Sequence, residues 1–161
     1  MMKQFVTAAF LAISLLPAAA QDAGEIARVQ AGQSCPGCNL FQADLAYLDL
    51  ENVDVSGARL RQSDMQLSTF DGWNLSGTNL SVANLFGTRF TRSNFTNANL
   101  QRAILVGTYF GSSSLKGSDL TGANISGADL SIAEGLSQHQ LDKACGDNST
   151  MLPKELTVPA C

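Results

Sequence analysis

Four cysteines are the residues of this 161-residue chain best suited to chemistry. Cys35 and Cys38 form the motif CPGC, and Cys145 and Cys161 lie near the end of the chain. A Cys-x-x-Cys pair can be a redox dithiol, whose reactive thiolate sits at a helix N-terminus. It can also supply half of a tetrahedral zinc site, or form a structural disulfide. The segments that position the motif must therefore decide its chemistry.

Other polar residues give little support for catalysis. The single histidine, His139, lies in a stretch with helix-capping signals, where we expect a solvated helix residue. Serine and threonine are frequent, but no base is placed to activate one as a nucleophile. Four carboxylates lie close together: Asp44, Asp49, Glu51 and Asp54. Nothing else in the sequence supports a calcium or general-acid role for them, so we predict no enzyme activity, no metal site and no cofactor.

The N-terminus has the features of a cleaved secretory signal. Residues 1–20 read MMKQFVTAAFLAISLLPAAA, with a basic start at Lys3, an apolar middle and an A-x-A site. We predict cleavage near Gln21 and a secreted or periplasmic protein. The apolar stretch is shorter than the about 20 residues that a membrane-spanning helix needs, so no membrane span is expected.

The charge balance argues against two kinds of partner. The formal net charge is −4 at pH 7. Nonspecific binding to nucleic acid or to an anionic membrane requires a basic surface. We therefore expect no nucleic-acid partner.

An apolar residue recurs every five residues from Leu40 to Leu130, and all 19 positions are Leu, Ile, Val, Met or Phe. A small residue usually stands two positions earlier, and Asp or Asn often stands between, as in the run Ala83-Asn84-Leu85. A period of five fits neither a helix nor a flat strand. It fits a coil with four short sides, in which the centre residue and the small residue point inward and the other three face water.

The units ADLAY, ANLFG, SDLTG, ANISG and ADLSI resemble the A(D/N)LXX unit of pentapeptide-repeat proteins over roughly residues 38–134. The resemblance implies that family's fold, an all-β, right-handed quadrilateral parallel β-helix, here with about 19 repeats in four to five coils. Residues twenty apart should then stack. Leu48, Val53 and Trp73 are bulky where the family prefers a small residue, so the coil is expected to be widened or distorted there.

Capping signals flank the repeat. Asp22 with Glu25 resembles a capping box, which indicates a short helix that ends near Gly32. Ser137 and Gln140 form a similar pair before Gly146, which indicates a second cap helix. The predicted organisation is a signal peptide (1–20), an N-terminal cap (21–37), the β-helix (38–134) and a C-terminal cap helix with a disulfide-tied tail (135–161).

The repeat frame changes the interpretation of the cysteines. Cys38 stands two residues before Leu40, so it occupies a small inward position, where its sulfur would be a poor nucleophile. A zinc site would need all four cysteines, or two with His139, to converge. The rod separates the two cysteine pairs by about 20 Å at a spacing of about 4.8 Å per coil. Of the three possible pairings, this distance favours Cys35 with Cys38 and Cys145 with Cys161.

Apolar residues at outward positions are a candidate contact site. One side of the coil carries Tyr47, Leu67, Phe86, Ile104 and Val106 facing out, and Tyr109 on the neighbouring side could extend the set. Contiguous exposed apolar surface indicates binding to a protein partner or self-association. The alternative is scattered surface residues that need no explanation. Five arginines make the middle of the rod basic, and we interpret them as solvated: Arg59, Arg61, Arg89, Arg92 and Arg102.

Three functions are compatible with these features. The sequence favours a non-catalytic, secreted or periplasmic structural or interaction module. The first alternative is a DNA-mimicking protein that interacts with a topoisomerase, as some members of the resembled family do, although export and the basic middle argue against it. The second is a thiol redox protein that uses CPGC.

Overall fold

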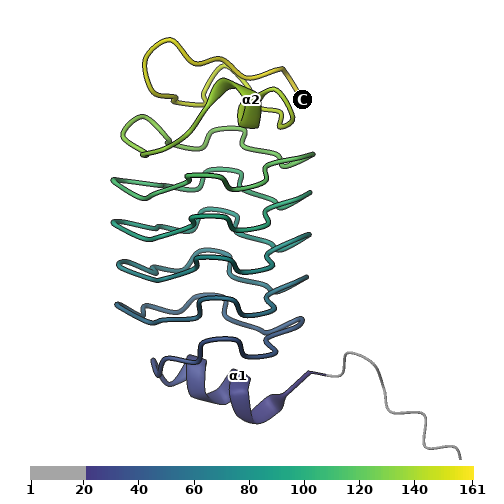
Figure 1. The fold of residues 1–161 in the computed structure, drawn as a ribbon, viewed down its shortest axis with the longest axis vertical. Coiled ribbons are helices and arrows are strands. Elements are labelled where there is room, and N and C mark those ends of the chain that lie inside the picture. Colours follow the sequence, from purple (N-terminus) through teal and green to yellow (C-terminus); the bar gives the residue numbers. More distant parts are fainter. Residues whose placement is uncertain (1–20) are drawn as a thin grey trace, which may run out of the picture.

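The computed structural model describes residues 21–161, and the predicted signal peptide, residues 1–20, lies outside them. The chain winds into coils that stack along one axis and form a rod (Figure 1). Helix α1 (Ala23–Gln30) covers the first coil, and helix α2 (Gln138–Leu141) lies at the opposite end. Within residues 21–161, the β-structure consists of isolated parallel bridges, one per side of each coil, in place of extended strands.

The bridges have one register throughout the repeat. They join residues twenty apart, from Asn39 and Arg59 to Ser114 and Glu134. Bridges recur every five residues along the chain, so each turn of twenty residues has four sides. The fold is therefore a four-sided parallel β-helix, and the predicted stacking of residues twenty apart is confirmed.

The centre residue of each repeat points into the rod. All 19 centre residues except Leu50 are buried, and Leu50 is half-buried and packs against the core. Aromatic side chains fill the middle of the core. The ring centroids of Phe70 and Phe90 are 5.9 Å apart, those of Phe90 and Phe110 are 5.8 Å apart, and Phe95 meets Phe90 edge-on at 4.8 Å. The large centre side chains thus form a continuous core along the axis of the rod.

Tight turns make the corners of the coil. In a typical corner, the backbone N–H of Ala43 donates to the carbonyl of Leu40 at 3.1 Å. The residue before the small inward residue has positive φ, as at Gln42 (54°), a conformation that favours glycine and asparagine. The first corner is the column of outward pairs 41–42, 61–62, 81–82, 101–102 and 121–122. The second corner is the column 46–47, 66–67, 86–87, 106–107 and 126–127.

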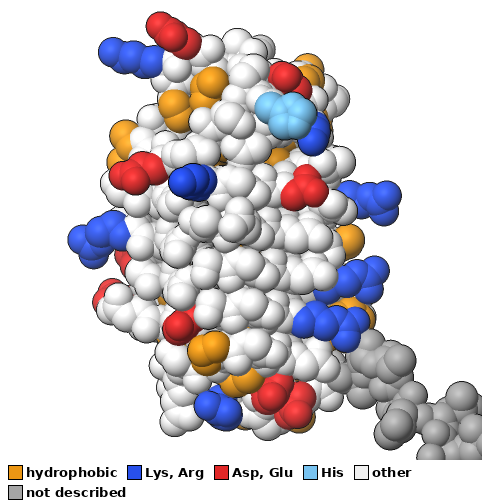
Figure 2. Space-filling view, viewed as in Figure 1, with side chains coloured by type: hydrophobic (Ala, Val, Ile, Leu, Met, Phe, Trp, Pro, Cys, Tyr) orange, Lys and Arg blue, Asp and Glu red, His pale blue; other side chains and the backbone are white. Residues whose placement is uncertain are grey.

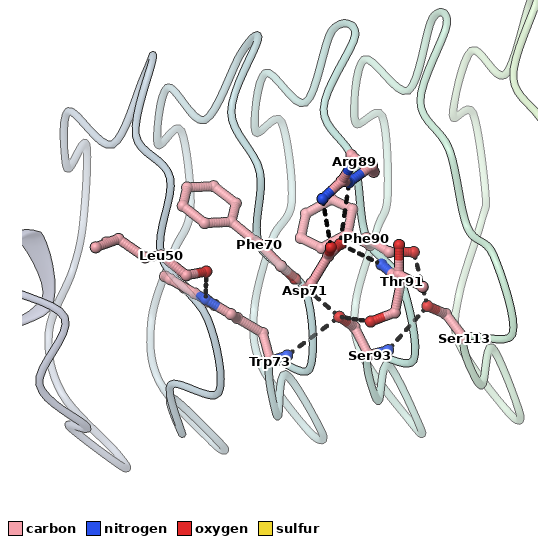
Figure 3. Close-up of polar contacts among 9 residues, drawn as sticks. All are labelled: Leu50, Phe70, Asp71, Trp73, Arg89, Phe90, Thr91, Ser93 and Ser113. Atoms are coloured by element: carbon pink, nitrogen blue, oxygen red, sulfur yellow. Dashed lines mark hydrogen bonds and ion pairs between the residues drawn. The ribbon is translucent and has the colours of Figure 1, made fainter.

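The predicted distortion occurs near Trp73, which is fully buried against Phe70 with ring centroids 4.3 Å apart. Its indole N–H donates to the carbonyl of Leu50 at 2.8 Å. The hydroxyl of Ser93, one coil further along, bridges the open turn: it accepts from the Trp73 backbone N–H at 3.1 Å and donates to the Phe70 carbonyl at 2.9 Å (Figure 3). A side-chain hydroxyl thus replaces the direct turn hydrogen bond at Trp73, and the Ser113 hydroxyl bridges the next turn at Ser93 in the same way.

A serine hydroxyl also replaces the backbone hydrogen bond of the turn near Leu48. This side chain is half-buried at the edge of the core. The Ser68 hydroxyl accepts from the Leu48 backbone N–H at 3.0 Å and donates to the Leu45 carbonyl at 2.9 Å. The third bulky residue, Val53, is buried. Serines of the following coil therefore bridge the turns at Leu48 and Trp73, whereas at the Val53 turn the Leu50 carbonyl accepts from the Trp73 indole.

Helix α1 seals the first coil with Ile26 and Val29, which are both buried. Asp22 is its N-cap and accepts from the backbone N–H groups of residues 24 and 25, each at 3.0 Å. The predicted capping box is only half correct, because the Glu25 carboxylate accepts from the backbone N–H of Asn39 in the first coil. Glu25 therefore ties the helix to the rod.

Helix α2 is shorter than the sequence indicated, because it ends at Leu141 and not near Gly146. After it, the chain rejoins the backbone ladder: Cys145 accepts from the N–H of Ile125 at 2.8 Å and donates to the carbonyl of Ala123 at 3.0 Å. An open sheet edge offers unpaired N–H and C=O groups. The residues after Leu141 pair with these groups and therefore do not continue the helix. The C-terminal segment thus closes the rod with backbone hydrogen bonds as well as with the helix.

Two phenylalanines in neighbouring repeats provide a matched test of this core. We expect Phe90→Ala to lower the free energy of unfolding by about 3–5 kcal/mol, because it leaves a cavity among packed rings. Phe86→Ala removes the same type of side chain from an exposed position, and it should change the free energy of unfolding by about 0.5 kcal/mol or less. Urea unfolding followed by circular dichroism measures both, and equal losses would contradict the assigned inward and outward positions.

The bridging hydroxyl of Ser93 can be tested separately. Ser93→Ala leaves the backbone N–H of Trp73 and the carbonyl of Phe70 buried without a partner, which should cost about 1–3 kcal/mol of unfolding free energy. Ser76→Ala is the control, since the Ser76 hydroxyl bonds only the side chain of Asn74. A Ser93→Ala protein as stable as the Ser76→Ala protein would show that the widened turn needs no bridge.

Candidate functional site

The CPGC motif is part of the first coil. Cys35 and Cys38 are both buried and form a disulfide. The Cys35 backbone N–H donates to the carbonyl of Asp54 at 2.8 Å, and the Cys38 carbonyl accepts from the N–H of Arg59 at 2.9 Å. The motif does not precede a helix, as a redox dithiol would. Its bonds make it the beginning of the rod wall.

Cys145 and Cys161 form the second disulfide, at the other end of the rod. A backbone bridge between Gly146 and Ala160 accompanies it, so the end of the chain is held against the cap. Both pairs are those that the distance argument favours. Within residues 21–161, no three His, Cys, Asp or Glu side chains converge as a metal site would require. Neither helix in this range has the length and apolar character needed to cross a membrane.

His139 borders a hollow of about 390 Å³ between the last coil and the C-terminal cap. The neighbouring Gln140 has a structural role there, because its amide donates to the carbonyls of Leu115 and Ser118 at 2.8 and 2.9 Å. In the described part of the chain, no hydrogen bond links His139 to a serine or a carboxylate. The hollow therefore lacks the hydrogen-bonded nucleophile and base that acyl transfer would need.

Within residues 21–161, the side of the rod between the first and second corners carries most of the large hydrophobic side chains that are exposed. Of the seven such side chains in the described range, five lie on it: Tyr47 (70%), Leu67 (50%), Val82 (42%), Phe86 (44%) and Ile104 (46%). The predicted Val106 lies there too and is half-buried, and Tyr109 on the next side is also half-buried. We call Tyr47, Leu67, Val82, Phe86, Ile104 and Val106 the apolar face. Val82 was missed, although its outward place in the five-residue frame could have revealed it.

Three residues of the apolar face have an unfavourable backbone conformation. Tyr47, Leu67 and Val82 have φ values of 60°, 51° and 59°. Left-handed backbone costs a residue with a side chain roughly 1–2 kcal/mol and is most unusual for a β-branched one. The other non-glycine residues with positive φ in the coils are Gln, Asn, Arg or Ser. Among the corners of the coils, bulky apolar residues therefore occupy the left-handed conformation on this side alone. Backbone strain that a protein retains in this way often marks a functional site.

The residues at the second corner form a continuous ridge. The backbone N–H of Leu67 donates to the Phe86 carbonyl at 2.8 Å, and that of Gly87 donates to the Val106 carbonyl at 2.9 Å. A Cβ atom at Gly87 would lie 2.7 Å from Cδ2 of Leu67, so the leucine side chain occupies the space that this glycine leaves free. Leu67, Phe86 and Val106 therefore lie on three successive coils as one strip.

Charged groups on the rod are few and mostly separate. On the side drawn in Figure 2, most Lys and Arg side chains project along the edges, and Asp and Glu side chains are scattered over a surface that is largely uncharged. One ion pair occurs within residues 21–161, in which Nη2 of Arg89 meets Oδ2 of Asp71 at 2.6 Å (Figure 3). Burial raises the pKa of Asp71, but hydrogen bonds from Arg89 and Thr91 outweigh this and hold its pKa below the usual value. This pair therefore lies away from the apolar face and stabilises a neighbouring side.

A sequence model of pentapeptide repeats matches eight copies in this chain, over residues 38–72, 63–101 and 93–131. The fold of that family is the right-handed quadrilateral β-helix, which agrees with the four-sided parallel coils. No curated protein sequence matches the chain significantly.

Solved structures of pentapeptide repeat proteins are also similar to the chain. One from the thylakoid lumen of Arabidopsis thaliana is 19% identical, with a TM-score of 0.34, over 78% of this chain and 61% of that one. HetL from Nostoc sp. PCC 7120, involved in heterocyst differentiation regulation, is 22% identical, with a TM-score of 0.41, over 81% of this chain and 70% of HetL. The protein alr5209 from Nostoc PCC 7120 is 28% identical, with a TM-score of 0.33, over 85% and 88%.

The Asp71–Arg89 pair predicts a defined pH dependence. Because the folded-state pKa of Asp71 is lowered, its contribution to stability is present above its unfolded pKa of about 3.9 and is lost as the pH falls through the folded value. Arg89→Gln should raise the Asp71 pKa in a carbon-detected NMR titration. The stability difference from the unaltered protein should be present at neutral pH and vanish at strongly acidic pH. A difference that is independent of pH would contradict this account.

Proposed function

The chain belongs to the pentapeptide repeat family, and we propose that it is a non-catalytic binding module that acts outside the cytoplasm and presents the apolar face to a protein partner. The observation that carries the proposal is that, among the residues the structure describes, five of the seven exposed large hydrophobic side chains lie on one side of an otherwise polar rod. Soluble proteins seldom expose contiguous apolar surface without a use for it.

The composition of the apolar face suits a protein partner. Aromatic residues are enriched at protein interfaces, and Tyr47 and Phe86 are exposed here. The backbone ladder on both sides of each coil holds these side chains on a rigid surface, so binding would cost little ordering of the module itself. The strained corners at Leu67 and Val82 support the same conclusion, because glycine or asparagine would relieve the strain.

The two disulfides support a location outside the cytoplasm. Disulfides form and persist in oxidising compartments and are rare where thiols are kept reduced. Cys35 pairs with Cys38 and Cys145 with Cys161, so no cysteine in the described chain is free. The predicted signal peptide points to the same compartment.

Both alternative functions have less support. DNA mimicry requires an acidic surface along the rod, but residues 72–118 contain no Asp or Glu. A thiol redox protein needs an accessible sulfur, and the sulfurs of CPGC are buried in the wall of the first coil. We therefore assign CPGC a structural role.

Photo-cross-linking in the source cell tests the proposed contact. A photo-reactive amino acid replaces Phe86 on the apolar face or, as the control, Ser76 at the corner opposite the second corner. We expect a discrete adduct with another protein from position 86 and none from position 76. Ile104→Ser should reduce that adduct by about tenfold or more, as truncation at the centre of an interface does. Unchanged circular dichroism would show that the fold is intact.

Two outcomes would contradict the proposal. Identical adducts from positions 86 and 76 would show that the apolar face has no special role. An adduct with the mass of two copies of this chain, as the sole product, would show self-association in place of a separate partner.

A further inference from the structure

A second feature of the same side is a small hollow at the first corner. It has a volume of about 230 Å³ and is lined by Arg61, Ser81, Val82, Gln101 and Arg102. Sites for whole small molecules usually measure about 300–1,000 Å³, so this hollow is better matched to a single side chain. Val82 belongs to the apolar face as well, which makes the hollow and that face continuous.

The repeat frame creates the hollow. Arg61, Ser81 and Gln101 are twenty residues apart, so they occupy equivalent positions on three successive coils. The backbone N–H of residue 62 donates to the Ser81 carbonyl at 3.1 Å, and that of Val82 donates to the Gln101 carbonyl at 2.9 Å. The short side chain of Ser81 thus lies between the longer side chains of Arg61 and Gln101. The backbones that carry the two arginines are two coil spacings apart, or about 10 Å.

Neither arginine of the hollow has a carboxylate partner within residues 21–161. The sole ion pair in that range is elsewhere, and Arg61 contacts only the side-chain oxygen of Gln62, at 3.4 Å. The carboxylate of Asp119, one coil beyond Gln101, accepts from the amide of Gln101 and from the hydroxyl of Thr121, each at 2.6 Å. Two guanidinium groups and the Ser81 hydroxyl are therefore available to an anion.

The charge of the surrounding chain favours an acidic ligand. Residues 72–118 contain four Lys or Arg residues and no Asp or Glu, although the whole protein has a net charge of −4. Within this range a carboxylate that approaches the hollow meets no negative side chain, and the Asp119 carboxylate just beyond it accepts hydrogen bonds from Gln101 and Thr121. Nucleic acid fits less well, because it requires a continuous basic surface, and Arg89 and Arg92 lie on the side beyond the second corner.

We infer that the hollow binds a carboxylate side chain of the partner, next to apolar side chains that pack on the apolar face. The partner segment is therefore a peptide with an acidic residue flanked by hydrophobic ones. Guanidinium groups bind carboxylates through paired, charge-assisted hydrogen bonds, which fix orientation as well as add affinity. This inference rests on the proposed function for its biological role, but the anion site can be measured without it.

Two short peptides that differ only in charge test the site. The probes are acetyl-Leu-Glu-Leu-amide and acetyl-Leu-Gln-Leu-amide, titrated into the disulfide-bonded protein and followed by the NMR signals of the arginine Nε–H groups. We expect the Glu peptide to bind about tenfold more tightly, as charge-assisted hydrogen bonds would give, and to shift the signals of Arg61 and Arg102. The double variant Arg61→Gln, Arg102→Gln should remove this preference.

Arg92→Gln is the matched control. Arg92 and Arg102 are both exposed and both have the left-handed corner conformation, with φ of 54° and 55°, so the two substitutions remove the same side chain from the same kind of corner. The Arg92→Gln protein should keep the tenfold preference. Equal affinity for the two peptides, or a preference that survives in the double variant, would overturn the inference.

The two proposals can fail separately. If the peptides discriminate as expected but position 86 yields no adduct, the anion site stands and the proposed partner is wrong. If position 86 yields a partner adduct but the peptides do not discriminate, only the carboxylate site is wrong. Tighter binding of a duplex oligonucleotide than of the Glu peptide, lost in the double variant, would show that the site serves nucleic acid.

Discussion

Backbone hydrogen bonds between residues twenty apart hold every other feature of this rod in place. Each side of an interior coil donates to and accepts from both neighbouring coils, as when the N–H of Asp64 donates to the Ala43 carbonyl and the N–H of Met65 donates to the Asn84 carbonyl, so the distance between coils is fixed at the sheet spacing. That spacing forces equivalent side chains into columns, inside the rod and on its surface. The phenylalanine stack of the core and the strip of Leu67, Phe86 and Val106 outside have the same origin.

The ladder also explains what the two ends must do. An unfinished coil exposes N–H and C=O groups that could pair with another chain. At the front, Glu25 accepts from the N–H of Asn39, and the Gln30 amide donates to the carbonyl of Asp44 at 2.8 Å. At the back, the chain itself returns to the ladder at Cys145 and Met151. Side chains and a disulfide-tied tail thus satisfy edges that have no further coil to meet.

The corners connect the fold to the proposed function. Each corner requires a left-handed residue, and glycine or a polar residue fills most of these places. On one side, Tyr47, Leu67 and Val82 take up the strain and expose apolar side chains to water. A rigid surface of this kind can bind without first becoming ordered. The arginines of the first corner add a charge preference that the apolar residues alone could not provide.

The sequence by itself determined the architecture, because a period of five over 19 repeats has one simple physical solution, in which centre residues point inward and residues twenty apart stack. It also favoured both disulfides and selected five of the apolar face residues from their outward positions. The structure alone decided how Ser93 bridges the turn at Trp73, how far α2 extends, and that Arg61 and Arg102 flank one hollow. These details depend on hydrogen-bond partners and free volume in neighbouring coils. The five-residue period assigns each residue to a column of the rod, but it does not specify the space around that residue.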